Sequence, residues 1–339
     1  MVEPIAASGS AVVPSNLAGR RVLLTGATGF IGAHLTSRLV DEGAHVSVLV
    51  RQAVADGRLS SLEGRISAHR GDVTDPFAVR AALAASRAEV VFHLAADTGA
   101  RRVELGWDGV ARALRVNLDG TLTVLRAVQE ASHDVAVFVR AGGLEEYGAG
   151  PIPYREEQRE APISPYSASQ VAATHFCQAL QPVTAATIVT LRPALVYGPG
   201  QSDDFFIPSL IRSCLANVPF EMTSGEQGRD LLYVDDVVDA FVRAASRLEL
   251  RGQVVNVGGG VEYAMRDVAR MIVRLSGTTA PLYVGAKPAR VGDIAHLVAD
   301  ASVARERLGW RARVGLEEGL QRTITWYRSS GRHRERLES

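Results

Sequence analysis

Lysine is almost absent from this chain. Only one of its 37 lysine and arginine residues is a lysine, Lys287, and 37 acidic residues balance them. The zero net charge gives no electrostatic reason to expect a nucleic acid or a membrane surface as a partner. The arginine bias, with abundant alanine and valine, indicates a GC-rich genome of actinobacterial type, in which antibiotic biosynthesis is a common activity.

Cysteine and long apolar runs are also scarce. Cys177 and Cys214 stand far apart and near no cluster of histidines, which predicts a reduced cytoplasmic protein without a metal site. No apolar run approaches the roughly 18 residues that a membrane-spanning helix needs. The start, Met1-Val2-Glu3-Pro4, lacks the basic flank and apolar run of a signal peptide. With 47% hydrophobic residues, the chain is expected to be a soluble globular protein whose partner is a small molecule.

Glycines mark the junction of a predicted strand and a predicted helix. Residues 25–32 read Thr-Gly-Ala-Thr-Gly-Phe-Ile-Gly, after the apolar residues 22–24 and before an amphipathic helix. A strand, a glycine turn and a helix N-terminus form the geometry that seats a dinucleotide pyrophosphate on backbone N–H groups. The expected contacts from this turn are Gly26, Thr28, Gly29, Phe30 and Ile31.

Further motifs follow the glycine turn in a fixed order. They are His-Leu-Ala-Ala at 93–96, Val-Asn-Leu-Asp-Gly-Thr at 116–121, Tyr-Gly at 147–148, Ser-Pro-Tyr at 164–166, Leu-Arg-Pro-Ala-Leu-Val-Tyr-Gly-Pro at 191–199 and Arg-Asp-Leu-Leu-Tyr-Val-Asp-Asp at 229–236. Over roughly residues 20 to 328 the chain resembles the extended short-chain dehydrogenase/reductase superfamily, whose members include NAD-dependent epimerases and dehydratases.

The resemblance and the alternation of strand and helix patterns predict an α/β fold. This would be a Rossmann-like, doubly wound parallel sheet with a smaller C-terminal substrate-binding region. We predict a flexible tail at 1–19, a dinucleotide-binding domain at 20–195 and a substrate-binding region at 196–339. One segment, about 236–258, is expected to return to the sheet. The resemblance also implies a possible homodimer.

The residue after the second strand bears on the choice of cofactor. Arg51 stands there, where an acidic residue would favour NAD, and it could clamp a 2′-phosphate. NADP(H) is therefore the expected cofactor, although a solvated surface arginine is the alternative. The resemblance implies further cofactor contacts from Asp72, Val73, Leu94, Ala95, Ala96, Tyr166, Gln170, Pro193 and Val196.

The catalytic set departs from the pattern of the superfamily. The resemblance places the catalytic tyrosine at Tyr166, with Asn117 also in the catalytic set, but Gln170 stands in place of the usual lysine and Gly143 in place of the usual Ser or Thr. Glu145 aligns with the glutamate base of sugar dehydratases, whereas the neighbouring aspartate of that pair is Leu144. A solvated loop is the alternative for Glu145 and Glu146.

Loss of the lysine affects the two directions of the reaction unequally. Gln170 can still hydrogen-bond the nicotinamide ribose, but it supplies no charge to lower the tyrosine pKa. At an unperturbed pKa of about 10, roughly one phenol in a thousand is ionised at pH 7, a cost of about 4 kcal/mol for a step that needs a base. Loss of the Gly143 hydroxyl removes a carbonyl hydrogen bond of a kind worth about 2.7–4 kcal/mol. The sequence therefore favours carbonyl reduction over alcohol oxidation.

Two arginines point to the ancestry of the substrate site. Arg229 and Arg290 fall where nucleotide-sugar members of the superfamily grip the diphosphate, although either arginine could equally sit in an intramolecular ion pair. The usual asparagine before Val-Tyr-Gly is Ala194, which weakens the sugar interpretation. The other expected substrate contacts are Asp97, Thr98, Gly143 and Leu144.

Three functions stay open on these observations. The first is an NADPH-dependent ketoreductase of a secondary metabolite, because the broken catalytic set resembles atypical angucyclinone ketoreductases, in which a phenol of the substrate is implied to supply the proton. The second is a nucleotide-sugar 4-ketoreductase or epimerase. The third is a non-catalytic NADP-binding protein.

Overall fold

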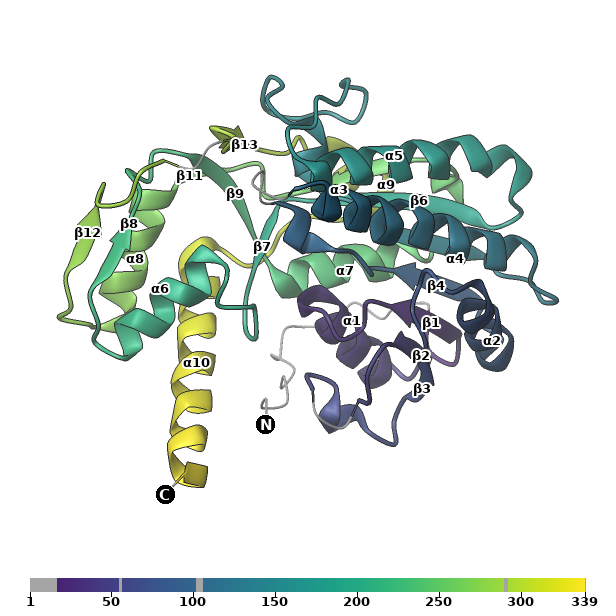
Figure 1. The fold of residues 1–339 in the computed structure, drawn as a ribbon, viewed down its shortest axis with the longest axis horizontal. Coiled ribbons are helices and arrows are strands. Elements are labelled where there is room, and N and C mark those ends of the chain that lie inside the picture. The colour runs from purple at the N-terminus through teal and green to yellow at the C-terminus, as the bar shows by residue number, and fades with distance from the viewer. Residues whose placement is uncertain (1–16, 55–56, 102–105, 290–291, 339) are drawn as a thin grey trace.

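Seven parallel strands form the central sheet of the protein (Figure 1). The computed structural model describes residues 17–54, 57–101, 106–289 and 292–338. The strand order β10-β6-β5-β4-β1-β2-β3 confirms the predicted doubly wound α/β fold. The strands are β1 (Arg21–Thr25), β2 (His45–Val50), β3 (Ser67–Arg70), β4 (Val90–His93), β5 (Val137–Ala141), β6 (Thr187–Pro193) and β10 (Val254–Val257).

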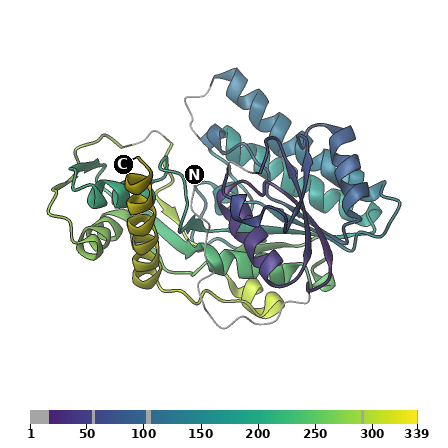
Figure 2. The same ribbon diagram turned by 90° about the horizontal axis from the view of Figure 1, so that it is seen from below.

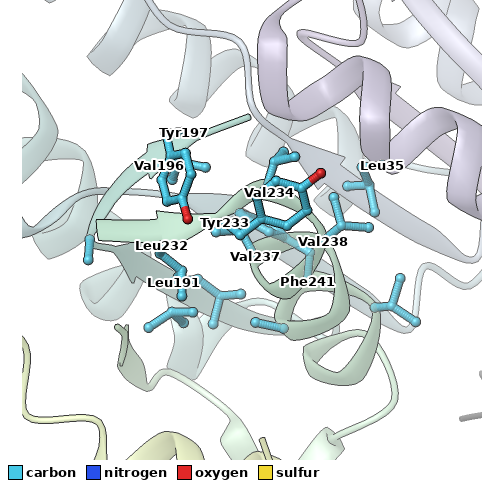
Figure 3. Close-up of a cluster of buried hydrophobic side chains, with 14 of the residues drawn as sticks. Leu35, Leu191, Val196, Tyr197, Leu232, Tyr233, Val234, Val237, Val238 and Phe241 are labelled. Atoms are coloured by element: carbon cyan, nitrogen blue, oxygen red, sulfur yellow. The ribbon is translucent and has the colours of Figure 1, made fainter. Parts of the chain in front are cut away.

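Helices cover both faces of this sheet, which is why its central strands are buried along nearly their whole length. One face packs against α2 (Pro76–Ser86), α4 (Gly120–Gln129) and α5 (Pro165–Leu180). The other face packs against α1 (Phe30–Asp41) and α7 (Val234–Ala244). Figure 3 shows this second core, where Val237 and Phe241 of α7 lie with Leu35 of α1 and Leu191 of β6.

The ends of two helices follow from their sequences. Asp75 precedes α2 and accepts the backbone N–H groups of Phe77 at 2.9 Å and Ala78 at 3.3 Å. Ser164 precedes α5 and accepts the N–H of Ser167 at 3.1 Å. A proline stands in the first turn of each helix, where its missing N–H costs nothing. The helix that carries Tyr166 therefore begins at a position fixed by its own sequence.

The smaller lobe lies beside the carboxyl ends of the sheet strands (Figures 1 and 2). In it, β9 pairs with β7, β11 and β13, while β8 pairs with β12. The strands are β7 (Leu195–Tyr197), β8 (Phe220–Met222), β9 (Gly228–Tyr233), β11 (Glu262–Ala264), β12 (Leu282–Val284) and β13 (His296–Leu297). The remaining α-helices are α3 (Trp107–Ala113), α6 (Phe206–Leu215), α8 (Met265–Ser276), α9 (Ser302–Leu308) and α10 (Leu316–Glu338).

Two features bear on the predicted division of the chain. Leu17 is buried in the core and the N–H of Gly19 donates to the carbonyl of Gly43 at 2.9 Å, so the prediction of a flexible tail is wrong for residues 17–19. The rest of that tail, 1–16, lies outside the described residues. Strand β10 lies beside β6 at the edge of the sheet, while the boundary at 195 stays a prediction.

Two features are absent from the described residues. No helix among them is long and apolar enough to cross a membrane. No group of three or more His, Cys, Asp and Glu side chains in the same ranges could hold a metal ion.

Candidate active site

The glycine turn between β1 and α1 is crowded by the backbone around it. Gly26 has φ +73°, and a Cβ atom on it would lie 2.5 Å from the backbone nitrogen of Ala95. Gly29 precedes α1 without a side-chain cap, so the first N–H groups of the helix have no side-chain acceptor there. Thr28 and Gly29 are exposed. This turn fits the pyrophosphate of a dinucleotide, as its sequence predicts.

Arg51 and Asp72 lie close together after the neighbouring strands β2 and β3. Arg51 is exposed after β2, and Asp72 follows β3. The Asp72 carboxylate accepts the N–H of Thr74 at 2.9 Å and its hydroxyl at 2.8 Å. Burial opposes ionisation of Asp72, but these hydrogen bonds and the positive charge of Arg51 hold its pKa below the usual value. The structure thus brings together the two residues expected to contact the adenosine half of a cofactor, with Val73 buried next to them.

His93, Leu94, Ala95 and Ala96 form the end of β4 and the turn after it. The His93 ring lies 2.7 Å from the Thr25 hydroxyl through Nδ1 and 3.0 Å from the Thr121 hydroxyl through Nε2. Burial, with a smaller contribution from the charge of Arg140, lowers the His93 pKa to about 3. His93 is therefore a neutral structural residue that ties β1 and α4 to β4.

One arginine beside the glycine turn carries no motif in the sequence. The guanidinium of Arg58 donates to the carbonyl of Thr28 at 3.0 Å and to that of Gly200 at 3.1 Å. It therefore joins the turn to the loop after β7 and adds a positive charge where a pyrophosphate would lie. Its position in a loop gave no periodic signal from which to predict it.

Tyr166 and Gln170 lie one turn apart on α5, both buried. Asn117 comes from the π-helical turn η3 (Leu114–Asp119) between α3 and α4. Its amide oxygen accepts the N–H of Asp97 at 2.7 Å, and its amide nitrogen donates to the Ser169 hydroxyl at 2.9 Å. Asn117 thus positions α5 against the turn after β4, and its predicted place in the catalytic set stays a prediction.

Arg140 is a second residue of this region, after Arg58, that no sequence motif marked. It lies on β5, is 1% exposed, and donates to the Gln170 side-chain oxygen. It also donates to the Gln170 carbonyl at 3.2 Å and to the Thr174 hydroxyl at 2.9 Å. A charged residue within the buried strand 137–141 is the signal that could have revealed it.

The loop after β5 supplies no hydroxyl for a carbonyl. The space around Gly143 is open, because a Cβ atom there would meet nothing within 4 Å. Leu144 is buried. Glu145 is half-buried, and its negative charge acts on Arg229. The open space at Gly143 lies where the superfamily pattern expects a Ser or Thr.

Glu146 is not in a solvated loop, so that alternative is wrong for this residue. It is 1% exposed and lies 2.6 Å from Arg192, which is itself fully buried. Its other oxygen accepts the N–H of Gly143 at 3.1 Å. The pair between β6 and this loop therefore fixes the backbone on which Gly143 stands.

The predicted substrate residues divide into three groups. Arg229 is 7% exposed and pairs with Asp293 at 2.6 Å, as one of the two alternatives held. Asp97 accepts from Arg112 at 2.5 Å, and Thr98 is exposed. Arg290 lies outside the described residues.

Two of the predicted cofactor contacts lie near the end of β6. Pro193 ends β6 and Val196 is buried in β7, so both lie at the carboxyl edge of the sheet.

Comparison with known proteins shows the family to which this fold belongs. The profile of the NAD dependent epimerase/dehydratase family matches residues 22–258. The chain belongs to this family. It is 33% identical over 322 residues to the UDP-glucose 4-epimerase of Mycolicibacterium smegmatis, covering 91% of this chain and 99% of the relative.

Two solved epimerases of the family superpose on the chain. One is the UDP-glucose 4-epimerase of Thermotoga maritima with UDP-glucose, at TM-score 0.83 and 27% identity, covering 91% of this chain and 99% of that one. The other is the UDP-glucuronic acid 4-epimerase of Bacillus cereus with UDP-glucuronic acid and NAD, at TM-score 0.82 and 28% identity, with the same two coverages. These epimerase/dehydratase relatives confirm the resemblance and support the nucleotide-sugar alternative better than the ketoreductase interpretation.

Proposed function

We propose that this protein binds a pyridine dinucleotide and reduces the 4-keto group of a nucleotide sugar. The substrate class rests on epimerases that match the chain over 91% of its length and are named for UDP-sugars. The direction rests on one observation of this chain: Gln170, where the family pattern has lysine, lies in the buried wall beside Tyr166. Without a lysine, proton donation is favoured over proton abstraction.

The residues of the chain divide this reaction between them. A dinucleotide bound in the reduced form would supply the hydride. The α1 N-terminus and Gly26 would hold its pyrophosphate, and the Gln170 amide would orient its ribose. Tyr166 would donate a proton to the developing alkoxide, a step that suffers no penalty from a high phenol pKa.

The choice between NADP(H) and NAD(H) rests on Arg51. Its exposed position after β2 and its proximity to Asp72 support a 2′-phosphate contact. The B. cereus relative is named with NAD, which supports the other cofactor. Calorimetry with NADPH and NADH side by side decides: a hundredfold preference for NADPH that Arg51→Ala abolishes supports the clamp, and equal affinity overturns it.

Arg229 would contact the sugar-nucleotide diphosphate after exchanging its partner. The Asp293 side chain with which it pairs is 36% exposed, so a phosphate could displace it without uncovering buried carboxylate. Both are anions that suit the planar guanidinium. The proposal predicts that Arg229→Ala weakens UDP binding, while Arg247→Ala, on the surface and paired with Glu249, leaves it unchanged.

The deciding experiment is turnover of NADPH and NADH with a UDP- or dTDP-4-keto sugar by the wild type and by Tyr166→Phe. We expect reduction by the wild type and a loss of more than about a hundredfold in the variant, as for removal of a positioned acid. No turnover with any 4-keto nucleotide sugar, together with no binding of UDP, would contradict the substrate class.

A ketone of a secondary metabolite is the second candidate. Two observations favour it: Arg229 is held by Asp293, and a Cβ atom at Gly143 would meet nothing within 4 Å. In this case a phenol of an aromatic polyketide next to the ketone would supply the proton, and Tyr166→Phe would lose less than about tenfold. The size of that loss therefore separates the two candidates.

A further inference from the structure

Arg140 is a buried cation with no carboxylate beside it. Over the described part of the chain, the contacts of its guanidinium are the Gln170 side-chain oxygen and carbonyl and the Thr174 hydroxyl, and none is an acidic group. Arg192, one strand away on β6, differs in this respect: it lies 2.6 Å from Glu146 and 2.7 Å from Glu160. Of these two buried arginines, Arg192 contacts carboxylates directly, whereas Arg140 reaches the Glu146 carboxylate only through the Thr174 hydroxyl, which donates to it at 2.8 Å.

Such an arrangement is costly for folding alone. A buried charge is normally paired, because removing an ion from water costs several kcal/mol unless a partner compensates. An apolar residue would suit a central strand of a parallel sheet better than arginine does. The charge of Arg140 nevertheless reaches His93 at the end of β4, whose ring it disfavours as a cation.

The contact with Gln170 also fixes the direction of that amide. A glutamine side chain has an acceptor oxygen on one edge and a two-proton donor on the other. Because Arg140 can only donate, it selects the oxygen edge of Gln170. The donor edge is then turned away from Arg140, and a flip of the amide would set N–H against N–H.

We propose that Arg140 and Gln170 together take over the cofactor-binding task of the missing lysine: Arg140 holds the Gln170 amide so that its N–H group can donate to the ribose of the dinucleotide. Arg140 is then a positioning residue, and Gln170 is the residue that touches the cofactor. This inference rests on the proposed function only in that a dinucleotide binds.

The test is a double-mutant cycle on dinucleotide affinity, measured by calorimetry. The variants are Arg140→Met, Gln170→Ala and their combination. Each single change is expected to raise the NADPH dissociation constant by about tenfold, the size of one charge-assisted hydrogen bond. The double variant is expected to be no weaker than either single one, because the two residues act in series. Additive losses would overturn the proposal.

Two more variants separate positioning from stability. Thr174→Val removes the hydrogen bond from Arg140 at 2.9 Å and the one to Glu146 at 2.8 Å but leaves Gln170 in place, so its affinity should match the wild type. Gln170→Glu keeps an acceptor for Arg140 and strengthens the pair, but it has no N–H for the ribose. We expect it to raise the melting temperature and still lose about tenfold in affinity. Wild-type affinity in Gln170→Glu would overturn the proposal, even if Arg140→Met does not fold.

A rescue completes the design. Gln170→Lys alone places a second buried cation against Arg140 and should bind NADPH poorly, whereas Arg140→Met with Gln170→Lys should bind it as the wild type does. If the combined variant binds NADPH no better than Gln170→Lys does, the proposed contact between Arg140 and the residue at position 170 is contradicted. A wild type that binds neither NADPH nor NADH would overturn the proposed function as well, while a working cycle without turnover of 4-keto sugars would leave only the substrate class wrong.

Discussion

The two ends of the site were built under different constraints. At the glycine turn, backbone crowding decides the residue type: Gly26 has φ +73° and no room for a Cβ atom. Around Gly143, at the other end of the candidate site, a Cβ atom would meet nothing within 4 Å, and Gln170 is held by a hydrogen bond from Arg140. Backbone crowding thus fixes the residue type at the glycine turn, whereas side-chain contacts decide the residues at the other end.

The largest effect is expected from the buried ion pair that supports the carbonyl end. Glu146→Gln removes the carboxylate 2.6 Å from the buried Arg192 and leaves Glu160, at 2.7 Å, as its remaining partner, so the fold should be destabilised by about 3 kcal/mol, the lower end of the range for a broken buried pair. Urea unfolding measures the change. Glu130→Gln, in an exposed pair with Arg126 at 2.8 Å, is the control and should show no resolvable change. Equal, small changes in both would mean that the buried pair does not hold this end together.

Crowding at the glycine turn gives the next prediction. Gly26→Ala places a Cβ atom 2.5 Å from the backbone of Ala95, so the turn must shift, and dinucleotide affinity should fall by about a hundredfold. Gly43→Ala is the matched control, because Gly43 has φ +83° and nothing within 4 Å of its Cβ position. It shares the backbone strain without the clash. Calorimetric titration with NADPH compares the two, and equal losses would assign the effect to strain alone.

His93 connects the two ends and should make stability depend on pH. Its pKa is lowered to about 3, mainly by burial. The His93 ring therefore stays neutral in the folded protein, whereas in the unfolded chain it binds a proton as the pH falls below about 6.5. Stability is complete above that range and falls as the pH drops toward 3. Between pH 7 and pH 5 the loss should be about 2 kcal/mol. The decrease of the urea midpoint between pH 7 and pH 5 should be smaller in His93→Gln. An equal decrease in the variant and the wild type would contradict the assignment of this pH dependence to His93.

The smallest effect is expected where the structure leaves space. Gly143→Ser adds a hydroxyl into open surroundings and should raise the rate of carbonyl reduction by about tenfold without loss of stability. Gly142→Ser is the contrasting variant, since its Cβ atom would lie 2.3 Å from the Glu146 carboxylate. A Gly143→Ser enzyme slower than the wild type would show that the space is occupied by substrate.

The sheet and the glycine turn were predictable because their signals are local. Residues 46–50, 90–94, 135–139 and 187–191 carry apolar runs of strand length, and each overlaps a strand of the observed sheet. The turn at 25–32 needs its glycines for backbone reasons that any chain would share. Periodicity and crowding are properties of neighbouring residues, so the sequence displays them directly.

The interior of the site was not predictable in the same way. Glu146 pairs with Arg192 and Arg140 with Gln170 across strands and helices that are far apart in the sequence. His175 of α5 has an exposed side chain whose Nε2 lies 3.3 Å from the Glu160 carboxylate. A partner brought in by tertiary folding decides the role of such residues, and no local pattern records it.

The place of β10 in the sheet has a consequence for how this protein is made. The chain leaves the sheet after β6, builds β7 to β9 elsewhere, and returns at residues 254–257 to pair with Thr190–Pro193. Until residues 254–257 have been synthesised and have paired with β6, that strand is an open sheet edge that can pair with strands of other chains. A fragment cut at the boundary near 195 would keep that edge for good. We expect this fragment to aggregate, so that the predicted dinucleotide-binding domain cannot be produced as a soluble protein on its own.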